Sequence, residues 1–120
     1  MATVDGLVLC TAGDHRLAFS AHEISGIDIW AEATVGMPYA RTAWQLPPAP
    51  GRLLVQEDSA VVVDTLEISS ESVSVLEVPP VLQNAAGGAL LSFFVFKGQL
   101  WPLLGLTRFA RFLEALGKNG

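Results

Sequence analysis

The chain has 120 residues and a formal net charge of −5 at pH 7, with 51% hydrophobic and 16% charged residues. This length fits one domain, residues 1–120, with its own core. The acidic balance and the absence of a basic run argue against nucleic acid and anionic membranes as partners. A single cysteine excludes an internal disulfide, and without a Cys/His cluster we expect no metal site and no cofactor.

No segment predicts membrane insertion. The longest apolar run, residues 89–96, contains Ser92 and ends at Lys97, whereas a membrane helix needs roughly 20 apolar residues. The first five residues lack the positive region of a signal peptide, so we expect a cytoplasmic protein. The mean hydropathy of +0.44 is high for so small a domain, which indicates that part of the apolar surface contacts a partner.

The first third of the chain predicts three strands. Residues 6–11 and 16–20 favour β structure and flank a turn that contains Gly13 and Asp14, so they predict a hairpin. Residues 21–26 suit a single helical turn. The alternation in residues 27–30 predicts a third strand.

Residues 31–51 predict a shortened, irregular connection. Glycine and proline recur through this segment, and only residues 39–46 could hold a helical turn or a brief strand. Long loops without anchors are uncommon in compact domains. We therefore expect Trp44 and Leu46 to pin the connection to the core.

The remaining sequence predicts two more hairpins and further strand structure. Residues 52–56 and 60–68 flank a turn at 57–59, and residues 72–78 alternate as a half-buried strand that ends at Pro79. Residues 90–96 and 99–104 flank Lys97 and Gly98, which favour a tight turn.

The C-terminal segment predicts a short α-helix over residues 107–116. Thr107 can cap its start, apolar residues recur at helical spacing, and Gly117 favours its end. The predicted fold is a mostly β small barrel or sandwich with one C-terminal helix.

Few residues could support catalysis. His15 and His22 fall in predicted turns without a partner at motif spacing, and Cys10 ends an apolar strand far in sequence from any cation. Asp64 interrupts an apolar run, so a backbone or hydroxyl donor must satisfy it if it is buried. These residues favour a non-catalytic binding domain. A small hydrolase or isomerase is the alternative if His15, His22 and Cys10 converge on one pocket.

Four blocks resemble the CheW-like domain, the adaptor of bacterial chemosensory arrays. Residues 6–19 resemble its first hairpin, and residues 21–26 (Ala-His-Glu-Ile-Ser-Gly) resemble the Val-x-Glu-Ile turn that follows. Residues 60–68 resemble a strand that ends in Val-Asp followed, after one residue, by an aliphatic. Residues 91–109 resemble the closing hairpin and terminal helix. Together the blocks cover about two-thirds of the chain in the family's order.

The chain also departs from the family pattern. Members hold a Gly-x-x-Asn-x-Arg-Gly turn before the second half, whereas this chain has only residues 39–46 there, without an Arg-Gly pair. The family folds as two five-stranded, SH3-like β-barrels. The resemblance therefore implies a CheW-like arrangement with an incomplete second barrel.

The resemblance implies a non-catalytic coupling function. Family members dock on the cytoplasmic tip of a methyl-accepting chemoreceptor and pair with the regulatory domain of a histidine kinase. The receptor groove includes the Glu-Ile turn, so Ala21, Glu23 and Ile24 are the implied receptor-contact residues. The missing strands leave it undecided whether the interface with the kinase is retained. The alternative is a small β-barrel interaction or accessory subunit unrelated to chemosensing.

Truncation predicts a further partner. An incomplete barrel leaves a strand edge unpaired, and such edges promote association. A homodimer, with or without exchanged strands, is the secondary expectation. Otherwise residues 31–51 cover the gap and the protein is a monomer.

Overall fold

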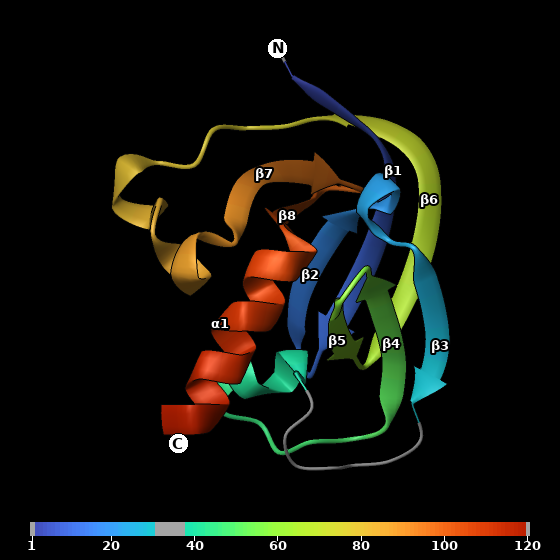
Figure 1. Cartoon of the computed structure of the whole chain (residues 1–120). Helices are drawn as coiled ribbons and strands as arrows, with labels where there is room; N and C mark the ends of the chain where they lie inside the picture. Colours follow the sequence, from blue (N-terminus) through green and yellow to red (C-terminus); the bar gives the residue numbers. More distant parts are fainter. Residues whose placement is uncertain (1, 31–37, 120) are drawn as a thin grey trace.

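The structure is a computed structural model that describes residues 2–30 and 38–119. This part of the chain is mostly β and forms two sheets with one α-helix (Figure 1). Its larger sheet, in spatial order β6-β1-β2-β8-β7, comprises β1 (Thr3–Ala12), β2 (His15–Ser20), β6 (Thr65–Ser74), β7 (Leu90–Phe96) and β8 (Gln99–Leu104). Its smaller sheet, in order β3-β4-β5, comprises β3 (Gly26–Trp30), β4 (Gly51–Gln56) and β5 (Ser59–Val63). The helix α1 spans Leu106–Asn119.

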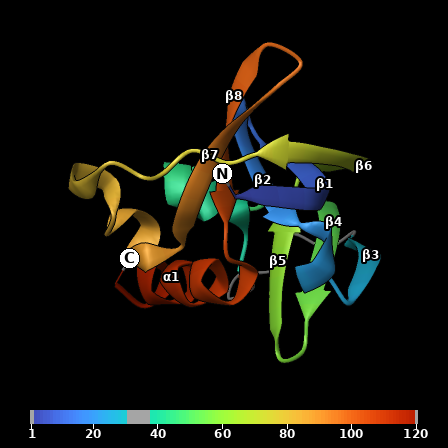
Figure 2. The same ribbon diagram turned by 90° about the horizontal axis from the view of Figure 1, so that it is seen from above.

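The larger sheet curls until its outer strands meet again. β1 pairs antiparallel with β2 and β6, and β8 runs parallel to β2, with Ala18 opposite Leu103. Just beyond β6, Leu76 exchanges two backbone hydrogen bonds with Phe93 of β7, at 2.6 and 3.1 Å. The sheet is therefore a curled half-barrel. Seen from above, its β7–β8 hairpin projects beyond the remaining strands (Figure 2).

The predicted hairpins are confirmed, and their turns follow from local chemistry. Gly13 has a φ of 61°, a left-handed conformation that favours glycine, and a Cβ there would lie 2.7 Å from Cδ1 of Leu46, which would have to shift. Lys97 and Gly98 have φ values of 50° and 76°, as a type I′ hairpin turn needs. The one-turn segment also forms, as the 3₁₀ helix η1 (Ala21–Glu23).

The central strands bury both of their faces. Successive side chains of a strand point to opposite sides, so the apolar run of β1 supplies two clusters. One cluster lies within the curl of the larger sheet and includes Leu7, Leu9, Ala18, Phe94, Phe96 and Leu103. The main cluster joins both sheets to α1 and includes Val8, Cys10, Leu17, Phe19, Leu54, Val61, Val63, Phe109 and Leu113.

The predicted strand over residues 60–68 is wrong in one respect. β5 ends at Val63 in the smaller sheet, and β6 begins at Thr65 in the larger one, so the chain changes sheets at Asp64. β6 then continues to Ser74, so it joins residues that were predicted as two segments, 60–68 and 72–78. It can do so because the ladder with β1 accommodates the extra residues through an irregularity at Gly6, whose φ is 84°.

The helix also differs from its predicted bounds. It begins at Leu106, where the Gly105 carbonyl accepts a 2.9 Å bond from the Phe109 amide. Thr107 therefore does not cap it, and its hydroxyl lies 3.2 Å from Oε1 of Gln56. The helix continues through Gly117, since one helical glycine costs only about 1 kcal/mol.

The irregular connection lies partly outside the described residues, at 31–37. Beyond them, Tyr39 forms a parallel bridge to Val62, and the 3₁₀ helix η2 spans Ala40–Trp44. Trp44 packs against the main cluster, which confirms it as an anchor, whereas Leu46 is half-buried and lies beside Gly13 of the exposed first hairpin turn. Tyr39, only 1% exposed, is a deeper anchor that the sequence analysis did not single out.

The Asp64 carboxylate ties three segments together at the junction between the sheets. Its Oδ2 accepts a 2.7 Å hydrogen bond from the Gly13 amide and forms a 2.6 Å ion pair with Nη1 of Arg41. Its backbone amide donates to the Thr11 carbonyl at 2.8 Å. Asp64 thus has the predicted structural role with a backbone donor, and Arg41 is an additional partner.

Replacing Asp64 should destabilise the fold. Asp64→Ala should lower the free energy of unfolding by about 2 kcal/mol, because it removes charge-assisted bonds and leaves two donors without their acceptor. Asp64→Asn keeps an acceptor oxygen and should cost roughly 1 kcal/mol. Urea denaturation followed by tryptophan fluorescence measures both. Asp58→Ala changes an exposed turn carboxylate and serves as the control. Equal losses for the Asp58 and Asp64 variants would contradict the role of the junction.

Candidate functional site

The three implied receptor-contact residues lie together on η1 and just after it. Ala21 and Ile24 are half-buried and pack against the main cluster. A Cβ added at Gly6 would lie 3.2 Å from the Ala21 Cβ, so β1 approaches this turn closely. His22, which lies between Ala21 and Glu23, and Ser25, which follows Ile24, are exposed. The turn thus presents a mixed surface whose apolar side chains are anchored in the core.

Glu23 has a partner within the protein. Its Oε2 accepts a hydrogen bond from the Leu106 amide at 3.4 Å, across 83 positions of sequence. Leu106 is the first residue of α1, where unpaired amides and the helix dipole favour a negative charge. The side chain therefore fastens the turn to the start of the helix.

Aliphatic side chains continue from this turn into β3. Ile27 packs partly against the main cluster, and Ile29, two residues along and so on the same face, is 74% exposed. We call Ile24, Ile27 and Ile29 the isoleucine face. Its polar neighbours are His22, Ser25 and Asp28, all exposed.

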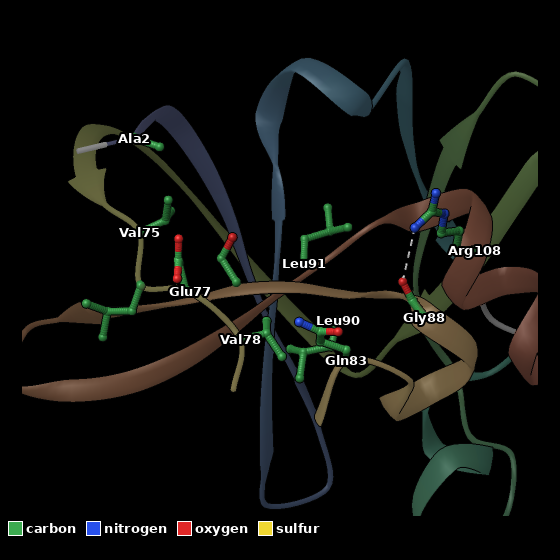
Figure 3. A pocket seen from close by; sticks show the side chains of 11 residues that line it. Ala2, Val75, Glu77, Val78, Gln83, Gly88, Leu90, Leu91 and Arg108 are labelled. Atoms are coloured by element: carbon green, nitrogen blue, oxygen red, sulfur yellow. Dashed lines mark hydrogen bonds between the residues drawn. The ribbon is translucent and has the colours of Figure 1, made fainter. Parts of the chain in front are cut away.

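A second surface feature is a groove of about 660 Å³ beside the outer edge of β7, which we call the β7 groove (Figure 3). It opens where residues 75–78 leave that edge. Leu76 and Leu91 lie on its two sides and are 48% and 42% exposed. Glu77 and Arg108 are the charged residues among its described lining, and they lie at opposite ends of the view in Figure 3.

The isoleucine face and the β7 groove are separate surfaces. The groove lining includes none of Ala21, Glu23 and Ile24. Both features nevertheless touch the first turn of α1, since Glu23 bonds Leu106 while Arg108 lines the groove. No sequence pattern predicted the groove. The pair Pro79-Pro80 predicted only the end of a strand over 72–78, whereas in the structure β6 ends at Ser74 and Leu76 forms an isolated bridge beyond it.

The structure does not bring His15, His22 and Cys10 together. His15 begins β2 and His22 follows its other end, so a six-residue strand, about 20 Å long, separates them. The His15 ring stacks on Trp44 with 4.4 Å between ring centroids. Cys10 is buried in the main cluster, where its Sγ lies 3.8 Å from the Val8 carbonyl, and burial raises the pKa of its thiol.

The described residues hold neither a metal-binding cluster nor a membrane-spanning helix. Residues 2–30 and 38–119 hold no group of three or more His, Cys, Asp or Glu side chains placed to bind a metal ion. Across the same ranges, no helix has the length and apolar character to cross a membrane.

Comparison with known proteins does not assign the chain to a family. No family model matches the sequence, and no curated protein matches it.

The bond between Glu23 and Leu106 leads to a prediction about stability. Glu23→Ala should lower the free energy of unfolding by about 0.5 kcal/mol, because it removes an acceptor and a negative charge from the start of α1. Glu23→Gln keeps the acceptor and should lose less. Thermal denaturation by circular dichroism compares the two variants. Glu71→Ala, at an exposed position on β6, is the matched control and should not change the melting temperature.

Cys10 should react only after unfolding. Its raised pKa keeps the buried thiol protonated, and the thiolate is the nucleophilic form. A disulfide reagent such as DTNB at pH 8 should therefore modify the native protein at least a hundredfold more slowly than the urea-unfolded chain. Similar rates in both states would show that the thiol is accessible in the fold.

Proposed function

We propose that this chain is a non-catalytic adaptor of a bacterial chemosensory system, which docks on the cytoplasmic tip of a chemoreceptor. The proposal begins from the four sequence blocks that resemble the CheW-like domain. The observation that supports it best is the position of the Glu-Ile turn, which leads directly into the isoleucine face. That face ends in an isoleucine that is 74% exposed.

The chemistry of this face suits a helical partner. An amphipathic helix binds through apolar side chains laid into a surface of aliphatic anchors with a polar rim. The isoleucine face supplies the anchors, and His22, Ser25 and Asp28 supply the rim. Because Ile24 and Ile27 pack against the main cluster, the core holds these anchors in place before binding.

We also propose how the two sheets relate to the family. The curled five-stranded sheet would be the retained SH3-like barrel, and the three-stranded sheet β3-β4-β5 the incomplete one. On this interpretation receptor docking is retained, whereas the surface for the histidine kinase regulatory domain is reduced. The protein would act in the cytoplasm, where the receptor tip lies.

The test is binding to a receptor signalling-domain fragment from the same chemosensory gene cluster, measured by isothermal titration calorimetry. Ile29→Glu should weaken binding at least tenfold, because it places a carboxylate on the apolar contact. This side chain is mostly exposed, so the fold should tolerate the change. Ile24→Glu should abolish binding. Because Ile24 packs against the core, the folding of this variant must be checked first.

The matched control is Val81→Glu. It makes the same kind of change at an aliphatic that is 87% exposed and distant in sequence from the isoleucine face. It should bind like the unmodified chain. Receptor binding that Ile29→Glu does not affect would contradict the proposed face. Binding to neither the receptor fragment nor the kinase regulatory domain would favour a β domain unrelated to chemosensing.

A further inference from the structure

The seam between the two outer strands of the curled sheet is nearly unpaired. Within residues 2–30 and 38–119, the backbone hydrogen bonds across it are the two between Leu76 and Phe93. On one side of this bridge lies the β7 groove. On the other, a shallower hollow of about 390 Å³ separates Val95 from Ser72–Ser74. The outer edge of β7 is therefore joined to its neighbour at a single point.

Among the described residues, the outer backbone edge of β7 has no hydrogen-bond partner beside the groove. Phe93 directs both its amide and its carbonyl across this edge to Leu76, and no backbone hydrogen bond joins Leu90–Ser92 to residues 75–78. The pairing with β8 matches Leu90 with Leu104 and Ser92 with Leu103, so Leu91 is an extra residue without a partner in β8. An open edge of this kind can pair with an added extended chain.

The charges at the two ends of the groove differ in sign, so they favour one orientation of a bound chain. Arg108 lies in the first turn of α1, where the helix dipole disfavours a cation. Its Nη1 donates to the Gly88 carbonyl at 3.3 Å, which holds the guanidinium at that end (Figure 3), and no ion pair of the described residues includes it. Glu77, at the other end, is exposed.

We propose that the β7 groove binds an extended peptide segment that adds as a strand antiparallel to β7. Alternate aliphatic side chains of the peptide would contact Leu76, Leu90 and Leu91. A carboxylate at its C-terminal end would pair with Arg108, and a basic residue at its N-terminal end with Glu77. The groove volume of about 660 Å³ is within the range of specific ligand sites. This inference does not depend on receptor docking, because it uses a different surface and a strand rather than a helix.

The probe is the acetylated and amidated peptide Lys-Val-Thr-Val-Thr-Val-Asp. The comparison peptide has the same composition, with the lysine and the aspartate exchanged between the two ends. Backbone amide shifts of the ¹⁵N-labelled chain measure affinity and location together. The first peptide should bind at least fivefold more tightly than the second, with the largest shifts at Leu91 and Ser92. A version with proline in place of both threonines should not bind, because proline cannot donate to a ladder.

Reversing the two charges in the protein tests the proposed orientation of the peptide independently. The double variant Glu77→Lys/Arg108→Glu should reverse the preference between the two peptides. Arg111→Glu changes an exposed arginine of the same helix outside the groove lining, and it should leave the preference unchanged. Receptor binding should be the same in all of these variants, so failure here is distinguishable from failure of the adaptor function.

Three outcomes would overturn the inference. The first is an absence of binding by either peptide up to about 1 mM, near the weak limit of specific recognition. The second is binding that ignores the charge reversal. The third is that the chain binds neither peptide but self-associates at high concentration, and that Leu91→Asp abolishes this association. That result would assign the edge of β7 to a second copy of this chain.

Discussion

The constraint on which the fold depends is the change of sheet at Asp64. The chain leaves the smaller sheet at Val63 and enters the larger one at Thr65, so one residue sets the position of each sheet relative to the other. The Asp64 carboxylate fixes this point by bonding the turn of the first hairpin and Arg41. The main cluster needs this placement because its members come from both sheets and from α1. The carboxylate inside the apolar run therefore stabilises the point at which the chain changes sheets.

The same topology restricts where a partner can bind. β1 and β2 are covered on both faces by the two clusters, so the central strands of the larger sheet offer a partner no open face. The surfaces that remain are at its margins, where the chain leaves a strand. One is the turn after β2 with the isoleucine face, and the other is the seam between residues 75–78 and β7. Both consist of apolar side chains beside polar ones, and the start of α1 touches both.

The residue types in the turns predicted the hairpins. The change of sheet at Asp64 was not predicted, because it depends on contacts between residues far apart in the sequence. Gly13 and Lys97-Gly98 identify their turns because a left-handed backbone restricts the residue types that fit. By contrast, residues 60–68 have the same strand propensity on both sides of Asp64. What separates β5 from β6 is long-range: β5 pairs with β4 and β6 with β1, and the Asp64 carboxylate between them bonds Gly13, 51 positions away, and Arg41, 23 away. Likewise, the bond between Glu23 and Leu106 spans 83 positions, and no local pattern in the sequence predicted it.

The open seam follows from the residues that border it. After Leu76 pairs with Phe93, the chain needs further backbone amides to extend the ladder along β7, but Pro79 and Pro80 have none to offer. On the opposite side, the extra residue Leu91 disturbs the register of β7 at the same level. Each feature alone would shorten the pairing. Together they separate the two edges and leave aliphatic side chains exposed between them, which is why a groove occupies the place where a closed barrel would have continuous hydrogen bonds.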